Sequence, residues 1–534
     1  MKKITTLMVM LVCCICSALA QTVASEATAP ENIQDGYYIL LVKSADGKTD
    51  DAGNFAHANS YDAKGSANDF VGTTLDDPSN YKYVYYITNN NGKLRIKSAF
   101  TDNWWESNKK VLGIYSDYRP SHISVGNSAT EFTYQLNDSW AYLKTQTKKT
   151  GWGKTETKDV FVTLNNKNQI GYWDNANPAS NTAQFQFYAV DINLPMTVSS
   201  EAAPVLYYLV GDVDNPTMIS HSSKENTAMR AVGEDAASIN DIAKDLWYVE
   251  GDFDNGFRFY NYNAKAHLMR DMEGQDMKLL NNNMSLAGRI TKWLILPLAD
   301  NKFTVCKFGS TDFSEVWYTA NPSVKLGAFS NSAKFSVETP TFTYTMYDGY
   351  DGYNYNTFSA PFDVKLASTE TDVKMYKGVA DYEAKEFKME EISAAPAEAG
   401  IFLMGNNANK EVTLEVTAGV PVLGKNDLIG STTDVEGLED KLILGPSTTT
   451  NKIGFFAAAD GVTRLYANHA YLMRQTLSTV EGLSLSFGGK PTGMGHVSTS
   501  DVKNAPIYDL TGRRVNHTVK GQLYIQGGRK FIAR

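Results

Sequence analysis

Cysteine is scarce in this chain. Four cysteines occur among 534 residues, and Cys13, Cys14 and Cys16 all lie within the first twenty. Cys306 is the only one in the rest of the sequence, so an intramolecular disulfide cannot form there. It lies in the apolar segment F-T-V-C-K-F, and we expect it to be buried as a small hydrophobic side chain.

Long apolar runs and an excess of basic charge are also missing. After residue 20, no stretch approaches the roughly 18 consecutive apolar residues of a membrane-spanning helix. The chain has 50 Lys and Arg against 59 Asp and Glu, for a formal charge of -9. Nucleic acids and anionic membranes bind basic surfaces, so neither is an expected partner.

Short catalytic and metal-binding signatures are absent as well. The sequence has no G-x-S-x-G, H-E-x-x-H, phosphate-binding loop, C-x-x-C or complete EF-hand loop, and its seven His are scattered. We therefore expect no catalytic residues of these types, no metal and no cofactor. A site assembled from distant residues stays open, because members of a serine triad need not be neighbours in sequence.

The first twenty residues have the pattern of a signal peptide. Lys2 and Lys3 precede the apolar stretch Leu7–Cys16, and Ala18-Leu19-Ala20 forms an A-x-A cleavage site. A lipoprotein signal is the alternative because of the three cysteines, but Val12, Cys13 and Ile15 precede them where a small residue is usual. A secreted protein without disulfides fits a bacterial surface protein.

Aromatic residues are abundant, at 12% with 30 Tyr, and they favour strands. Leu246-Trp247-Tyr248-Val249 is echoed by Lys292-Trp293-Leu294-Ile295 and Lys334-Phe335-Ser336-Val337, at spacings of 46 and 42 residues. Polar turns follow the first two, as D-F-D-N-G and L-A-D-N-K. We interpret Asp252–Gly256 as a hairpin turn rather than an ion site, since Asp and Asn accept backbone hydrogen bonds and Gly takes positive φ.

The first third of the chain repeats this pattern at Tyr83-Val84-Tyr85, Phe132-Thr133-Tyr134 and Phe185-Gln186-Phe187. Three such units per domain resemble a β-trefoil of the ricin-type lectin class, and A-Q-F-Q-F at Ala183–Phe187 is similar to the Gln-x-Trp repeat of that family. The resemblance implies two tandem β-trefoil-like domains, at residues 35–191 and 205–345. A β-sandwich with unequal loops is the alternative.

The remaining segments complete an all-β prediction. Residues 21–34 read as a spacer, 192–204 as a linker, and Asp235–Asp245 as a helical turn. Short strands between polar turns predict an antiparallel β-sandwich domain over 346–487, similar to a module of proteins exported by type IX secretion. A Gly/Ser/Thr-rich linker at 488–504 precedes a short β tail at 505–534. Its I-Y-D-L-x-G-R-R-V…K-G-x-L-Y-I resembles a type IX sorting signal, which implies secretion machinery as a partner.

Two tryptophan-bearing segments are the candidate ligand sites. Exposed aromatic rings can stack on sugar rings while adjacent carboxylate and amide groups bind hydroxyls. The candidate sugar-binding residues are Asp102, Asn103, Trp104 and Trp105 in one segment, and Trp173, Asp174 and Asn175 in the other. Packing in the floor of a barrel is the competing interpretation of both.

These features favour a secreted or outer-surface protein of a Gram-negative bacterium that binds polysaccharide or glycoprotein glycans, or mediates adhesion, without being an enzyme. Two alternatives remain. One is a secreted hydrolase acting on glycans or peptides, although no local signature marks a pair of catalytic carboxylates. The other is a structural surface protein with protein partners only.

Overall fold

The structure is a computed structural model. It describes residues 23–44, 54–55, 78–102, 109–111, 130–151, 154–164, 170–173, 177–179, 182–211, 217–223, 226–231, 238–271, 275–280, 288–309, 313, 315–320, 323–328, 333–349, 352–406, 408–447, 452–474, 482–487, 507–508, 514–515, 520, 523–526 and 529–532. Strands dominate these residues, which confirms the all-β prediction. The predicted helical turn is also confirmed, as α2 (Ile239–Ile242) followed by the 3-10 turn η3 (Ala243–Asp245).

Six strands of the N-terminal part pair in a closed ring, which we call the N-terminal ring. In pairing order they are β1 (Gly36–Ser44), β3 (Val84–Asn90), β4 (Lys93–Asp102), β6 (Thr133–Asn137), β7 (Trp140–Gly151) and β10 (Ala183–Val190). Leu94 and Phe132 join β4 to β6 through reciprocal backbone hydrogen bonds of 2.8 and 2.9 Å. Four outer strands extend this sheet: β2 (Asn54–Phe55), β5 (Lys109–Val111), β8 (Lys154–Leu164) and β9 (Ile170–Trp173).

A second closed ring, the central ring, follows. Its strands are β11 (Tyr207–Gly211), β14 (Leu246–Asp252), β15 (Gly256–Asn261), β18 (Trp293–Pro297), β19 (Phe303–Lys307) and β22 (Phe335–Glu338), and β22 pairs back to β11. Three hairpins join the ring strands: β12 (Thr217–Ser223) with β13 (Asn226–Ala231), β16 (Ala266–Arg270) with β17 (Met277–Leu280), and β20 (Glu315–Ala320) with β21 (Ser323–Ala328).

Two buried tryptophans make equivalent hydrogen bonds in this ring. Trp247 Nε1 on β14 donates to the Ile219 carbonyl oxygen on β12 at 2.6 Å, and Trp293 Nε1 on β18 donates to that of Leu268 on β16 at 3.1 Å. Phe335 occupies the corresponding place on β22, and its side chain has no N–H group to donate. The repeat of the Trp-bearing segments in sequence is thus matched by a repeat of their contacts.

The third group of strands is sandwich-like. A small sheet has the order β23 (Thr341–Thr345), β31 (Glu411–Thr417), β26 (Asp363–Leu366) and β29 (Ala394–Ala395). A ten-stranded sheet has the order β24 (Tyr347–Asp348), β25 (Tyr353–Phe358), β30 (Ile401–Asn406), β27 (Lys374–Asp381), β28 (Glu386–Ile392), β38 (Gly482–Phe487), β35 (Ile453–Ala457), β34 (Lys441–Pro446), β37 (His469–Met473) and β32 (Ile429–Ser431). On β30, Ile401 and Leu403 join one core while Phe402 and Met404 join another.

The ten-stranded sheet curls until its two ends meet. The backbone N–H of Ala470 on β37 donates to Thr357 Oγ1 on β25 at 3.0 Å, and that of Ser359 donates to the Asn468 carbonyl oxygen at 3.2 Å. These bonds form a seam between strands at opposite ends of the pairing order. The short pair β33 (Val435–Glu436) and β36 (Arg464–Leu465) lies in the same part of the chain.

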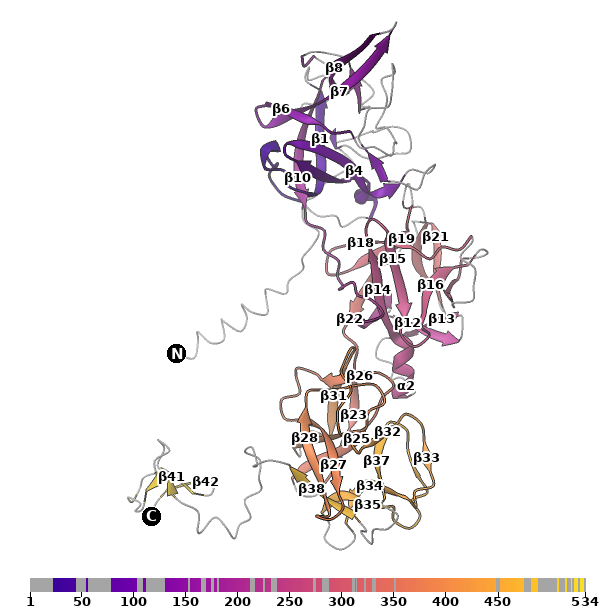
Figure 1. Ribbon diagram of the computed structural model, residues 1–534, viewed down its shortest axis with the longest axis vertical. Coiled ribbons are helices and arrows are strands. Elements are labelled where there is room, and N and C mark those ends of the chain that lie inside the picture. The colour runs from indigo at the N-terminus through magenta and orange to yellow at the C-terminus, as the bar shows by residue number, and fades with distance from the viewer. Residues whose placement is uncertain are drawn as a thin grey trace.

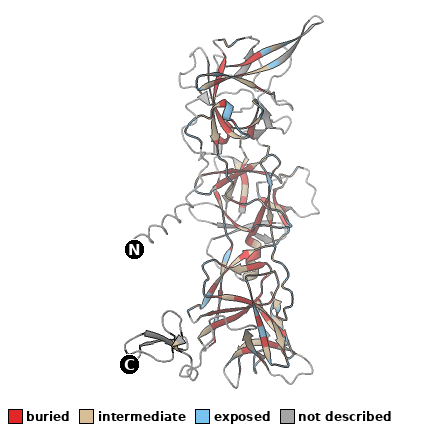
Figure 2. Ribbon diagram, turned by 60° about the vertical axis from the view of Figure 1, so that its left-hand side comes forward, coloured by how far each residue is buried: buried red, intermediate tan, exposed pale blue. Residues whose placement is uncertain are grey.

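The three groups of strands stack along the long axis of the molecule (Figure 1), with buried residues in each (Figure 2). Strands with both faces buried join them, because successive side chains of a strand point to opposite faces. On β18, Trp293 and Ile295 face the central core, while Leu294 and Leu296 join Ile39, Tyr81, Val84, Phe100, Cys306 and others in a cluster that we call the N-terminal junction. Cys306 is fully buried, as predicted.

The C-terminal junction is built in the same way. On β14, Trp247 and Val249 face the central core, whereas Leu246 and Tyr248 belong to a cluster shared with Phe358, Phe362, Val364, Leu414 and other residues of the third group. Asn240 Nδ2 donates to the Thr432 carbonyl oxygen at 2.6 Å across this junction. Hydrophobic burial and hydrogen bonds therefore fix the third group against the central ring.

Residues 192–204 lie against the central ring: Met196 is buried, and the Ser199 N–H donates to the Val249 carbonyl oxygen at 2.8 Å. At the other end of the chain, a four-stranded sheet has the order β40 (Arg514–Val515), β39 (Ile507–Tyr508), β41 (Leu523–Gln526) and β42 (Arg529–Ile532). The predicted signal peptide and the 488–504 linker lie outside the described residues. Within the described ranges, no helix has the length and apolar character needed to cross a membrane.

Candidate functional site

The two tryptophan-bearing segments lie mostly outside the described residues. Asp102 ends β4, where it pairs with Lys109 of β5, and Trp173 ends β9, opposite Phe161 of β8. Asn103, Trp104, Trp105, Asp174 and Asn175 are not among the residues that the structure describes. Among the described residues, β5 pairs with β4 and β9 with β8, and no described strand pairing joins β5 to β9.

The acidic Asp252–Gly256 segment is a hairpin turn, as predicted. Asp252 Oδ1 accepts the backbone N–H groups of Asp254 at 2.8 Å and Asn255 at 2.7 Å. The Asn255 side chain donates to the same carboxylate and, with these backbone bonds, lowers the Asp252 pKa. The carboxylate is thus held by the turn itself. No cluster of three or more His, Cys, Asp or Glu suited to a metal occurs in the described part of the chain.

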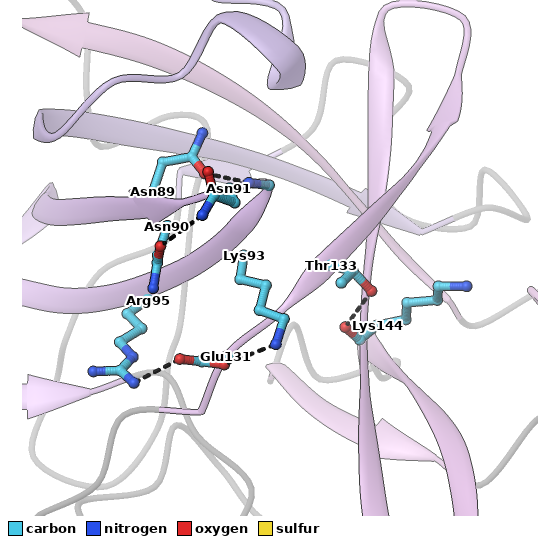
Figure 3. Close-up of polar contacts among 9 residues, drawn as sticks. Asn89, Asn90, Asn91, Lys93, Arg95, Glu131, Thr133 and Lys144 are labelled. Atoms are coloured by element: carbon cyan, nitrogen blue, oxygen red, sulfur yellow. Dashed lines mark hydrogen bonds and ion pairs between the residues drawn. The ribbon is translucent and has the colours of Figure 1, made fainter.

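A polar cluster on the N-terminal ring is also explained by local structure (Figure 3). In the β3–β4 turn the Gly92 N–H donates to Asn89 Oδ1 at 2.8 Å. Nearby, Arg95 Nη2 donates to Glu131 Oε1 at 2.6 Å, with Lys93 Nζ 3.5 Å from the other carboxylate oxygen. The Arg95 hydrogen bond holds the Glu131 pKa below its usual value. Such exposed ion pairs contribute little stability, and this cluster presents no enclosed site.

A partly open groove of about 280 Å³ lies at the seam of the ten-stranded sheet. It forms where β24 and β37 diverge, because both lie along β25, at different parts of that strand. The lining residues come from β24, β25, β34, β35, β36 and β37: Tyr347, Asp348, Tyr355, Asn356, Thr357, Leu444, Gly445, Pro446, Ile453, Leu465 and His469. Ring-shaped sheets commonly hold ligands at such openings.

Two polar residues in the lining of this seam groove are already engaged within the fold. Asn356 and Thr357 are almost fully buried. Asn356 Nδ2 donates to the Thr345 carbonyl oxygen at 2.7 Å, and Thr357 Oγ1 accepts the Ala470 N–H.

The rim of the groove carries its polar chemistry. Tyr347 is 59% exposed and precedes Asp348 on the edge strand β24. His469 Nδ1 lies 3.0 Å from the Ala467 carbonyl oxygen. A ring nitrogen facing a carbonyl must carry the proton, which leaves Nε2 of the neutral imidazole as an acceptor. A phenol, a carboxylate and an imidazole thus meet at one opening.

Sequence reasoning did not find this groove. Tyr347 and Asp348 open a Gly/Tyr-rich turn, and His469 lies more than a hundred residues later, in a segment that only resembles a secreted module. Only the curling of the sheet brings them together. The available signal was the adjacent pair Tyr347 and Asp348. Neighbouring side chains of a strand point to opposite faces, so a strand of two residues cannot bury both.

No protein-family model and no curated protein matches the chain. Several solved structures are similar to it at low scores. A GH54 α-L-arabinofuranosidase soaked with a cyclic sulfate inhibitor covers 59% of this chain and 71% of its own, with 11% identity and a TM-score of 0.21. An arabinofuranosidase bound to arabinofuranosyl-α-1,2-xylobiose covers 60% and 74%, also at 11% and 0.21. An exo-β-1,3-galactanase from Clostridium thermocellum covers 56% and 67%, at 11% and 0.20. At these scores the likeness carries no functional argument.

Proposed function

We propose that this protein is a secreted or outer-surface protein of a Gram-negative bacterium that binds glycans and serves adhesion. The observation that carries the proposal is the seam groove, where exposed Tyr347 stands beside Asp348 and His469. An exposed aromatic face packs on the C–H face of a sugar ring, while charged and imidazole groups exchange hydrogen bonds with its hydroxyls.

The architecture supports the same proposal. We infer that both closed rings are β-trefoils of the ricin type. Each ring closes six strands, and the central ring adds three hairpins and the repeated Trp247 and Trp293 contacts. Packed junctions would hold several binding surfaces on one stiff chain. Binding through two sites at once can raise a weak affinity by roughly 10²–10⁴.

A hydrolase needs more than the described lining of the groove provides. Glycosidases use two carboxyl groups about 5–10 Å apart, and Asp348 is the one carboxylate among the described lining residues. We therefore place binding first, and we make product release an outcome of the test.

The test is a glycan array with the full mature chain, covering bacterial, host and plant glycans. We expect binding to a defined subset, and we expect Trp104→Ala or Trp173→Ala to weaken part of it about tenfold without loss of the β circular dichroism spectrum. Absence of binding across the whole array would overturn the proposal. Release of soluble sugar from the bound polysaccharide would replace it with the hydrolase.

Delivery to the surface is proposed to depend on the C-terminal tail and the type IX secretion machinery. Among the described residues, β39–β42 pair only with one another. Deletion of residues 505–534 should therefore leave the three groups of strands folded while surface exposure, measured by protease treatment of intact cells, is lost. Unchanged exposure of the truncated protein would contradict the sorting role.

A further inference from the structure

The lining of the seam groove contains two kinds of side chain, and their combination points to the kind of sugar it would hold. Leu444, Pro446, Ile453 and Leu465 supply aliphatic groups, whereas Tyr347, Asp348 and His469 supply polar ones. An unsubstituted hexose carries hydroxyls around its whole edge, and any that face the aliphatic residues would lack partners. A buried hydroxyl without a hydrogen bond is costly.

We propose that the groove binds one terminal sugar ring that carries a methyl group, as an N-acetylhexosamine or a 6-deoxyhexose does. The methyl group packs against Leu444, Ile453 and Leu465, while the ring face lies on Tyr347. Hydroxyls on the opposite edge donate to the Asp348 carboxylate and to His469 Nε2. This inference rests on the proposed glycan-binding function and adds the ligand class and the site.

The size of the groove sets the length of the ligand. Pockets for drug-sized ligands occupy about 300–1,000 Å³, and the groove, at about 280 Å³, lies just below that range. The groove is therefore too small to enclose a drug-sized ligand, and we expect it to hold a terminal ring while the rest of a glycan extends into solvent. This favours recognition of a chain end over recognition of an internal segment.

Tyr347 is the residue whose loss tests the groove directly. It is 59% exposed on the edge strand β24 and is part of the groove lining. Tyr347→Ala therefore removes the platform for the ring without opening a cavity in the core.

Tyr466 provides the matched control. It is 60% exposed, close to the value for Tyr347, and it follows the lining residue Leu465. Its ring lies 4.7 Å from the Arg464 guanidinium, and it is not part of the groove lining. Tyr466→Ala thus removes an equally exposed phenol from the same region of the surface.

The experiment measures binding of three methyl glycosides to the full mature chain by ligand-observed NMR titration: N-acetylglucosaminide, fucoside and glucoside. We expect one of the first two to bind with a millimolar dissociation constant and the glucoside to bind at least tenfold more weakly. The N-acetylglucosaminide and fucoside arms distinguish the two sources of the methyl group. Tyr347→Ala should weaken binding at least tenfold, and Tyr466→Ala by less than twofold.

Equal binding of the glucoside, or full binding by Tyr347→Ala with an unchanged circular dichroism spectrum, would overturn the inference. Failure of the groove is distinguishable from failure of the proposed function. If glycan-array binding persists in Tyr347→Ala but is lost in Trp104→Ala or Trp173→Ala, the protein binds glycans elsewhere. If the wild-type chain binds nothing on the array and none of the three glycosides, both proposals fail.

Discussion

Three fully buried indoles of the central ring differ in their hydrogen bonds. Trp247 and Trp293 donate to carbonyl oxygens, whereas Trp317 Nε1 has no partner among the described residues. A hydrogen bond contributes about 0.5–1.5 kcal/mol net. We expect Trp293→Phe to lower the free energy of unfolding by about 1 kcal/mol more than Trp317→Phe. Urea titrations followed by far-ultraviolet circular dichroism measure this, and equal losses would show that the Trp293 bond contributes nothing.

His267 is the titratable group with the clearest effect on acid stability. Burial, with a smaller contribution from Arg258, lowers its pKa from 6.5 to about 4. The unfolded chain therefore takes up a proton near pH 6.5, while the folded protein does so only near pH 4. The contribution of the neutral His267 imidazole to the free energy of unfolding is complete above pH 6.5 and is lost as the pH falls towards 4.

His267→Gln removes this proton uptake, so we expect thermal stability to fall less between pH 6.5 and 4 in the variant than in the wild type. The measurement is the melting temperature at a series of pH values. His469→Gln is the control, because His469 lies outside the central ring. A wild-type pH dependence that persists unchanged in His267→Gln would contradict the assignment.

Single residues were predictable where their role is local. Burial of Cys306 followed from its apolar neighbours, and the hydrogen bonds of Asp252 followed from the Asp-Asn-Gly turn. The meeting of Asp348 with His469 was not predictable, because it depends on how far a ten-stranded sheet curls. Trp104 and Trp173 remain sequence-based candidates: the first lies outside the described residues, and only the backbone of the second is described.

At the scale of elements, two hairpin glycines have similar backbones and different surroundings. Gly92 has φ of 81° and open space where a Cβ would lie, while Gly251 has φ of 105° and a Cβ there would lie 2.2 Å from the Gly256 carbonyl oxygen. Positive φ alone costs an alanine roughly 1 kcal/mol. We expect Gly92→Ala to cost about that much and Gly251→Ala about 3 kcal/mol or more, in denaturant titrations. Similar values for both would mean that the β14–β15 hairpin relaxes freely.

Most strands were predictable from alternating patterns and turn residues, as in the D-F-D-N-G turn between β14 and β15. The patterns did not show that a continuous apolar run can pack against two different clusters, one on each face of the strand. Trp293–Pro297 is buried along its whole length because its two faces meet two different clusters. Periodicity cannot distinguish a strand that packs against two clusters from a strand buried within one core. The two junctions between the groups of strands were therefore not predicted.

At the scale of the whole molecule, we expect that the contacts of the N-terminal junction can be broken while both rings stay folded. Leu294→Asp places a charge in a buried apolar cluster that includes Tyr81, Phe100 and Val316. Burial of an unpaired charge costs several kcal/mol, and opening the junction relieves it. We expect small-angle scattering to show a less extended, more variable shape while the circular dichroism spectrum is retained.

Lys97→Ala is the control at the same junction. It removes the 2.8 Å ion pair with Asp254, whose side chain is 67% exposed. Because water screens this pair, its loss should change the stability of the junction very little. A scattering profile for Leu294→Asp that matches both wild type and Lys97→Ala would show that the apolar contacts do not hold the junction.

The order in which the rings close has a kinetic consequence. In each ring the first strand pairs with the last, β1 with β10 and β11 with β22. Neither barrel can therefore complete its hydrogen bonds until nearly its entire sequence is available. Pairing between such distant segments makes folding slow. A chain that folds slowly stays unfolded for longer after synthesis. Under the proposed secretion, ring closure would lengthen the interval in which the polypeptide can be threaded through a narrow translocation pore.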